Sequence, residues 1–86
     1  MLTRHQLAEL RRSPVVNRNR LARAMELAGL TQVQLAEAVR STQPRISAIC
    51  NGRFAEDGLP VEVARRYADF FGCDIDDLFP AKQEVA

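Results

Sequence analysis

The chain is 86 residues long, which is enough for one domain with a single hydrophobic core. Its composition, 47% hydrophobic and 27% charged, is that of an ordinary globular protein. No apolar run reaches the ~18 residues of a membrane span, and the N-terminus lacks the pattern of a signal peptide, so we expect a cytoplasmic protein.

The net charge of +1 conceals an uneven distribution along the chain. Residues 1–53 contain nine arginines and three glutamates, whereas residues 54–86 contain three basic and eight acidic residues. The first segment therefore carries +6 and the second −5, which together give the net +1. A basic segment rich in arginine is typical of a domain that turns one face to a polyanion, although arginines solvated on helix surfaces give the same count.

Helix signals follow one another along the whole chain, and no segment alternates with the period of a strand. The first helix is expected to be capped by Thr3, with Gln6 completing a capping box, and to end near Ser13-Pro14. Ser13 as N-cap and Pro14 at the first position are predicted to open the next helix, which stops at Gly29.

Two short helices joined by a tight turn are predicted next, the arrangement called a helix-turn-helix. The first is expected to begin at Thr31, an N-cap residue with a glutamine three positions on to complete a capping box. The second is capped by Thr42 or Ser41 and ends at Gly52.

The exposed side of the second of these helices is suited to close contact with another surface. Ile46 and Ile49 mark its buried side, because residues three apart share a face of a helix. The other side is free of acidic residues and carries Gln43, Pro44, Ser47, Ala48 and Asn51, with Arg45 on the flank. Short side chains permit close approach, and carboxylates there would be repelled by phosphate. The alternative is the ordinary solvated face of a helix in an all-α domain.

A loop over residues 53–59 and two further helices complete the predicted all-α fold of five or six helices. Pro60 opens a helix with apolar residues at core spacing, which Gly72 closes. Asp74 caps a final short helix, and Pro80 prevents its continuation. The expected organisation is a single domain over 1–80, with an N-terminal extension helix in 1–13, the helix-turn-helix in 31–52 and a loose tail at 81–86.

Several short motifs occur together at the spacing of a known family. They are Leu30-Thr31-Gln32, Leu35-Ala36, Ile46-Ser47, Ile49, Asn51-Gly52-Arg53, Phe71-Gly72 and Leu78-Phe79. On these residues the chain resembles the Cro and phage-repressor type of helix-turn-helix DNA-binding domain (XRE-like), which also occurs in small bacterial regulators and antitoxins. The match is ungapped from Leu30 to Arg53 and covers about residues 20–79. It implies a compact five- to six-helix bundle.

Three features depart from that family. Arg40 stands where glycine is usual in a left-handed conformation, at a cost of about 1 kcal/mol. Met25 and Cys50 stand where relatives often carry an arginine–glutamate pair, so we predict that these two side chains touch. The loop after the second motif helix is usually basic but here contains Glu56 and Asp57, which leaves open a protein partner at this loop.

The resemblance implies that helix 42–52 enters the major groove of double-stranded DNA. Base contacts are expected from Gln43, Pro44, Arg45, Ser47 and Ala48. Gln43 can read adenine through its amide, and Pro44 and Ala48 offer apolar surface to a thymine methyl group. Phosphate contacts are expected from Thr31, Gln32, Arg40, Asn51 and Arg53, with Arg18 and Arg20 as candidates of lower rank.

The sequence gives little support for a catalytic or metal-binding site. His5 is the only histidine, and neither Cys50 nor Cys73 has a further cysteine or histidine near it, so no metal or catalytic site can be assembled. The acidic residues at 74–77 serve most simply as a helix cap and first-turn acids. We therefore expect no cofactor and no enzyme activity, with Cys50 as a redox sensor kept as an alternative.

The function implied by the resemblance is that of a sequence-specific transcriptional regulator, and we expect a repressor of bacterial or phage origin. One such domain covers only a few base pairs, so a homodimer is expected. Its contacts are expected from the C-terminal helix with Leu78 and Phe79, or from the N-terminal helix, which can equally cover the core. The alternatives are an antitoxin that binds DNA and a toxin protein, and a protein-binding adaptor without DNA function.

Overall fold

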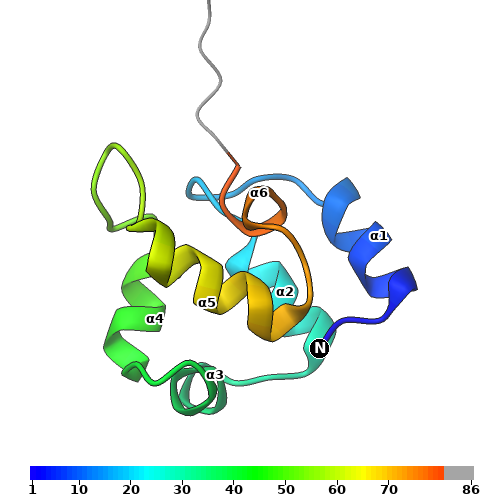
Figure 1. Ribbon diagram of the computed structural model, residues 1–86, viewed down its shortest axis with the longest axis horizontal. Helices are drawn as coiled ribbons and strands as arrows, with labels where there is room; N and C mark the ends of the chain where they lie inside the picture. The colour runs from blue at the N-terminus through cyan, green and yellow to red at the C-terminus, as the bar shows by residue number, and fades with distance from the viewer. Residues whose placement is uncertain (81–86) are drawn as a thin grey trace, which may run out of the picture.

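The computed structural model describes residues 1–80, which form six helices around one core (Figure 1). In chain order these are α1 (Arg4–Arg12), α2 (Leu21–Ala28), α3 (Gln32–Ala38), α4 (Gln43–Cys50), α5 (Val61–Phe71) and α6 (Ile75–Leu78). The described residues contain no strand beyond an isolated bridge between Val16 and Asn19. The predicted all-α fold is confirmed, while the expectation of a loose tail at 81–86 falls outside the described residues.

Most of the predicted helix ends are confirmed by their capping hydrogen bonds. The hydroxyls of Thr3 and Thr31 each accept a hydrogen bond from the amide three residues on, at 3.1 Å. The side chains of Gln6 and Gln34 accept in return from the amides of the two threonines, so both capping boxes are complete. Thr42, and not Ser41, caps α4.

The predicted start of the second helix is wrong. Residues 13–20 are not helical, Ser13 ends α1, and α2 begins only at Leu21. Asn17 and Arg18 have φ angles of 54° and 69°, and the residues on either side of this pair exchange both of their backbone hydrogen bonds. Two successive left-handed residues are the geometry of a type I′ turn, in which asparagine is favoured. Pro14 would also fit the first position of a helix, but in the structure it follows the end of α1.

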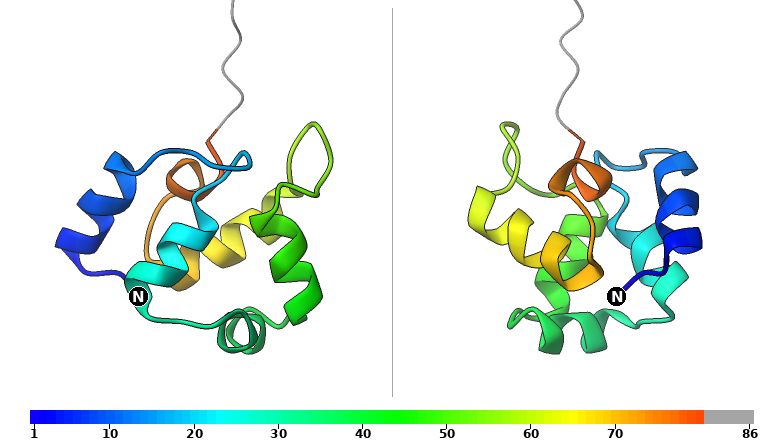
Figure 2. Two further views of the ribbon diagram at one scale, coloured as in Figure 1. Left: turned by 180° about the vertical axis from the view of Figure 1, so that it is seen from behind. Right: turned by 45° about the vertical axis from the view of Figure 1, so that its right-hand side comes forward.

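The helix-turn-helix forms one edge of the molecule, and α5 runs across the centre with α2 behind it (Figures 1 and 2). α3 and α4 pack on each other and bury Leu35, Ile46 and Ile49, each at most 2% exposed. α5 contributes Tyr67 and Phe71 to the same core. Full burial of one such side chain stabilises a fold by about 1.5–3 kcal/mol, so this core fixes how α4 lies against the rest of the chain.

α1 lies on the side of the molecule opposite α4 and covers the core there (Figure 2). Leu2 and Leu10 are buried, and the amide of Leu2 donates to the carbonyl of Phe71 at 2.9 Å. The guanidinium of Arg11 forms a bidentate pair with the carboxylate of Asp77, at 3.0 and 3.2 Å, which joins α1 to α6. Of the two roles expected for the N-terminal helix, the structure therefore shows the covering of the core.

Two of the departures from the family can be located in the structure. Arg40 has a φ angle of 58°, so the left-handed conformation expected at this position is confirmed. Met25 on α2 is buried, and Cys50 on α4 packs against the same hydrophobic cluster. The direct contact between the Met25 and Cys50 side chains stays a prediction.

The expectation that Leu78 supplies a dimer contact is wrong. Leu78 is fully buried in the core of its own chain, because α6 turns it inward under α5. Phe79 is half-buried and packs against the rings of Phe54 and Tyr67, with centroids 6.3 and 6.1 Å away. The C-terminal segment within the described residues thus serves mainly the fold of its own chain.

We expect the pair between Arg11 and Asp77 to make the stability of the fold dependent on pH. Partial burial acts to raise the pKa of the Asp77 carboxyl, but hydrogen bonds from Arg11 and from the amide of Asp74 outweigh it, and the pKa is lowered from 3.8. A carboxyl whose pKa is lowered by folding contributes stability above its unfolded pKa, and that contribution is lost as the pH falls through the folded pKa.

We therefore expect the thermal unfolding midpoint of the protein to fall between about pH 5 and pH 3, and to fall less in Asp77→Asn. Asp76→Asn is the matched control, because Asp76 is exposed and forms no ion pair within residues 1–80. Equal pH dependence in Asp77→Asn and the unsubstituted protein would show that the pair with Arg11 does not couple folding to pH.

Across residues 1–80, no helix combines the length and the apolar character that crossing a membrane requires.

Candidate nucleic-acid interface

The helix-turn-helix consists of α3, the turn at residues 39–42 and α4. Val39 is buried in this turn, and the amide of Ser41 donates to the carbonyl of Ala36 at 2.7 Å. The turn is thus anchored both to the core and to the last turn of α3. Because Ile46 and Ile49 point into the core, the opposite side of α4 is left to solvent.

The residues predicted to contact bases lie together on that outer side of α4. Gln43, Pro44 and Arg45 in the first turn are exposed, whereas Ser47 and Ala48 in the second turn are half-buried. No ion pair involves Arg45 within residues 1–80, so its charge is available. The first turn of α4 therefore presents an amide, an apolar ring and a free cation to an incoming surface.

Gln43 is held by a contact that the sequence did not predict. Its side-chain nitrogen donates to the side-chain oxygen of Gln32, so the first residues of α3 and α4 are joined. A primary amide has two N–H donors and an acceptor oxygen, and one donor is used here. The remaining N–H and the oxygen are the pair that a bidentate contact with a base requires.

The residues predicted to contact phosphate come from the beginning of α3, from the turn and from the segment after α4. Thr31, Arg40, Asn51 and Arg53 are exposed and Gln32 is half-buried. The hydroxyl of Thr31 is already used in the α3 cap, and the amide of Asn51 donates to the carbonyl of Ser47 at 2.9 Å. Neither Arg40 nor Arg53 takes part in an ion pair in the described part of the chain.

Arg53 and Arg45 line the same hollow, of about 240 Å³, between α4 and the loop that follows it. Ala48 and Phe54 supply part of its wall. Arg45 and Arg53 therefore bring two positive charges to the border of this hollow. The position of Arg45 beside Arg53 is compatible with a contact to phosphate as well as to guanine.

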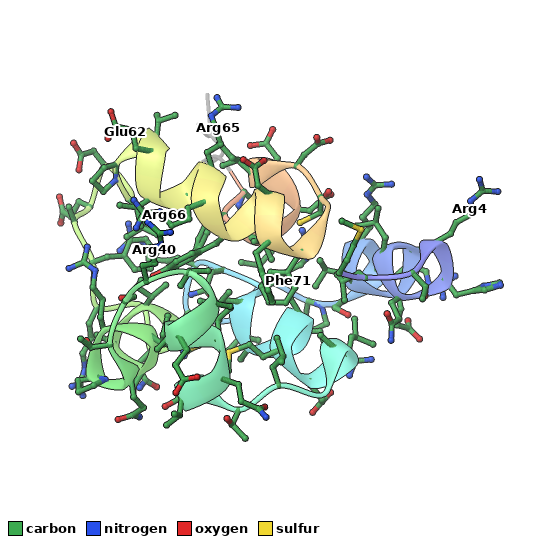
Figure 3. All side chains as sticks on the ribbon, turned by 60° about the horizontal axis from the view of Figure 1, so that its bottom comes forward. Arg4, Arg40, Glu62, Arg65, Arg66 and Phe71 are labelled. Atoms are coloured by element: carbon green, nitrogen blue, oxygen red, sulfur yellow. The ribbon has the colours of Figure 1, made fainter. Side chains whose placement is uncertain are left out.

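Arg66 adds a second positive charge, beside that of Arg40, at the turn of the helix-turn-helix. Arg66 on α5 donates to the carbonyl of Val39 at 3.3 Å. Figure 3 shows Arg66 close to Arg40, with Glu62 one turn back along α5, whereas Arg4 lies at the far end of the molecule on α1. Arg66 could not be identified from the sequence, because its contact with the turn depends on how α5 packs against residue 39.

The two arginines ranked lower as phosphate contacts are both engaged with the main chain. Arg18 donates to four carbonyl oxygens in the segment 52–56. Arg20 donates to the carbonyls of Ser13 and Asp77, at 2.9 and 3.3 Å. Their positions are set by the non-helical fold of residues 13–20.

The C-terminal end of α4 is capped by side chains from the turn before α2. The amide nitrogen of Asn19 donates to the carbonyl of Ile49 at 2.8 Å, and that of Asn17 donates to the carbonyl of Cys50 at 3.2 Å. These bonds satisfy carbonyls that the end of a helix otherwise leaves free. An asparagine on each side of Arg18 is a turn signal that could have pointed to this arrangement.

The loop after α4 presents acidic side chains to solvent. Glu56 and Asp57 are exposed, and neither forms an ion pair within residues 1–80. Their negative charge lies on the same loop that begins with Arg53. Any contact with DNA at this end must therefore keep these two carboxylates away from phosphate.

The two cysteines are half-buried free thiols. Burial raises the pKa of Cys50. Burial, together with the carboxylates of Asp77 and Asp74, raises the pKa of Cys73 to about 11. Because the thiolate is the reactive form, this environment disfavours the redox-sensor alternative for Cys50. In the part of the chain that the structure describes, no group of three or more histidine, cysteine or acidic residues is placed to hold a metal ion.

Comparison with known families agrees with this geometry. The family model described as helix-turn-helix matches residues 21–78, which include α2 to α6 and leave α1 outside. The chain therefore belongs to the helix-turn-helix family of the Cro and phage-repressor type, a family of DNA-binding regulators. The resemblance seen in the sequence is confirmed. No curated protein and no solved structure gave a significant match.

Proposed function

We propose that the protein is a sequence-specific transcriptional repressor that binds double-stranded DNA as a homodimer, with α4 in the major groove. The observation that carries this proposal is the outer side of α4, where Gln43, Pro44 and Arg45 are exposed without a neighbouring acid on the helix. Membership of the family supports DNA binding as such, and the side chains on α4 support the reading of base sequence.

In this proposal Gln43 reads an adenine. The contact with Gln32 fixes one N–H of the Gln43 amide and leaves the other N–H and the oxygen for the adenine N7 and N6 groups. Pro44 and Ala48 face a thymine methyl group beside it, and Ser47 adds one polar contact. Arg45, at the edge of the helix, reaches a guanine or a phosphate.

Phosphate contacts would position α4 in the groove from both sides. Thr31 and Gln32 would act at the beginning of α3, and Arg40 at the turn. Asn51 and Arg53 would act at the opposite end of α4. The guanidinium of Arg53, which is exposed and forms no ion pair within residues 1–80, would be the strongest contributor. Such contacts fix the register of the protein without reading sequence.

A homodimer follows from the size of the surface. A single domain of this kind reads only a few base pairs, and two half-sites about one helical turn apart give useful specificity. A dimer bound over a promoter blocks the access of polymerase, which is the simplest form of repression.

The acidic loop favours an antitoxin as the second candidate function. Glu56 and Asp57 are exposed and form no ion pair within residues 1–80. Beside a DNA-binding surface they are suited to a basic protein partner, such as a toxin that the same chain neutralises. A protein-binding adaptor without DNA function would not require the acid-free side of α4 or the exposed guanidinium of Arg53.

Arg53→Ala tests the DNA contact directly. We expect it to weaken binding to every duplex and to lower the slope of log K against log salt by about 0.9, the value expected when one phosphate fewer is neutralised. Fluorescence anisotropy with a labelled duplex at several salt concentrations measures both quantities.

Arg4→Ala is the matched control for this measurement, because Arg4 is exposed, forms no ion pair within residues 1–80 and lies at the far end of the molecule (Figure 3). Its salt slope is expected to equal that of the unsubstituted protein. An Arg53→Ala slope equal to that of Arg4→Ala would remove Arg53 from the DNA interface.

A further inference from the structure

Arg18 spans the distance between the turn before α2 and the loop after α4. Its Nη1 atom lies 3.4 Å from the carbonyl oxygen of Gly52 and 2.9 Å from that of Phe54. Its Nη2 atom lies 2.7 Å from the carbonyl oxygen of Ala55 and 3.1 Å from that of Glu56. One guanidinium thus binds the main chain of a single short segment at four points.

The same guanidinium also stacks on an aromatic ring. Its central carbon lies 4.1 Å from the centroid of the Phe54 ring, within the range of a cation–π contact. Phe54 in turn packs edge-on against Phe79, which lies next to α6. The loop is therefore attached to the body of the protein through Arg18 and through Phe54 together.

These contacts bracket Arg53. Two of the four carbonyls belong to its immediate neighbours, Gly52 and Phe54, and its own amide donates to the carbonyl of Ala48 at 2.8 Å. The backbone of Arg53 is held on both sides, while its side chain is exposed and unpaired within residues 1–80. The direction in which the Arg53 side chain leaves the surface is thereby fixed.

The turn that carries Arg18 is itself packed against the end of α4. A Cβ atom on Gly52 would lie 3.0 Å from the carbonyl oxygen of Asn17, so the two backbones are in close contact here. Asn17 and Asn19 also bind the last carbonyls of α4. In Figure 2 this turn extends toward the base of the loop between α4 and α5. Arg18 therefore projects from a rigid support.

We propose that Arg18 is a positioning residue for the contact of Arg53 with DNA, and that it is not itself a phosphate ligand. This inference rests on the proposed DNA-binding function. A loop that is ordered before binding loses less conformational entropy on binding, so a fixed Arg53 binds phosphate more tightly than a mobile one. The donors of Arg18 are directed at the loop, and its charge is stacked on Phe54.

Replacing Arg18 by lysine and by alanine distinguishes a positioning role from the role of a charged phosphate ligand. Lysine keeps the positive charge of a phosphate ligand, but its single ammonium cannot reproduce a planar fork that binds four carbonyls. We expect Arg18→Lys and Arg18→Ala to lose affinity for a selected duplex to a similar extent, by about tenfold. Binding of Arg18→Lys at the level of the unsubstituted protein would overturn the proposal, because charge alone would then suffice.

A double-mutant cycle with Arg53 provides the second readout. We expect Arg53→Ala to reduce affinity by about tenfold in the unsubstituted protein but less than about twofold when Arg18 is already alanine. A full effect of Arg53→Ala in the Arg18→Ala background means that the two arginines act independently, which contradicts positioning. Circular dichroism establishes folding of each variant, and Arg18→Gln replaces Arg18→Ala in the cycle should the latter not fold.

Two controls separate the inference from the function on which it rests. Absence of DNA binding by the unsubstituted protein overturns the proposed function, and with it the role of Arg18 in binding. Hydrogen exchange reports on the loop without DNA, because the amide of Gly58 donates to the carbonyl of Ala55 at 2.9 Å. Faster exchange of the Gly58 and Arg53 amides in Arg18→Ala supports the positioning of the loop, and unchanged exchange contradicts it.

Discussion

Replacing Leu35 by alanine is expected to lower the free energy of unfolding by about 2–5 kcal/mol. Leu35 is fully buried where α3 packs on α4, and its removal leaves a cavity that the packed helices cannot close. A domain of this size is stable by only about 5–15 kcal/mol, so the variant loses a large part of its stability. Urea denaturation followed by circular dichroism at 222 nm, the standard helix signal, measures the difference.

Val33→Ala is the matched control on the same helix. Val33 is 54% exposed, and alanine is the better helix former, so its replacement is expected to change the free energy of unfolding by less than about 0.5 kcal/mol. Equal losses in the two variants would contradict the packing of α3 against α4 that orients the helix-turn-helix.

Replacing Gln43 by alanine is expected to reduce affinity for the preferred DNA site by about 5- to 150-fold, the range for one bidentate base contact. Its amide lies at the exposed beginning of α4 and is already oriented by Gln32. The more specific expectation is a loss of preference at one base pair of each half-site, while binding to unrelated DNA changes little. Competition with duplexes altered at single positions measures that preference.

Gln34→Ala serves as the control for Gln43→Ala. Gln34 is an exposed glutamine of the same motif, but its side chain closes the capping box of α3. Its removal is expected to cost some stability and to leave base preference unchanged. If Gln43→Ala also left every base preference unchanged, Gln43 would not be a reader of sequence.

Local signals predicted the helices well wherever the determining contacts are local. Thr3, Thr31 and Thr42 cap their helices through residues three positions away, so the sequence contains both partners. The burial of Ile46 and Ile49 follows from the helical period alone, and with it the exposure of Gln43 and its neighbours.

The errors arose where distant segments decide the outcome. Ser13-Pro14 is as compatible with a helix end as with a helix start. The left-handed conformations of Asn17 and Arg18 form a turn here, so no helix starts at Pro14. That turn is stabilised by carbonyls more than thirty residues further along the chain. Nothing local to Arg18 identifies those acceptors, so its contacts with the main chain of residues 52–56 could not be predicted.

The candidate site was predictable in its location more than in its internal contacts. Periodicity and the absence of acids located the outer side of α4. The hydrogen bond between Gln43 and Gln32, and the hollow shared by Arg45 and Arg53, depend on the crossing of α3 and α4 and on the path of the following loop. Leu78 shows the same limit, because only the packing of α6 reveals that it is buried.

Selection of bound duplexes from a random DNA library, followed by sequencing, tests the central claim most directly. At near-physiological salt the protein is expected to enrich a two-fold symmetric site, with A·T pairs in half-sites about one helical turn apart. No enrichment by a protein shown to be folded would contradict the assignment as a sequence-specific regulator that binds DNA by itself.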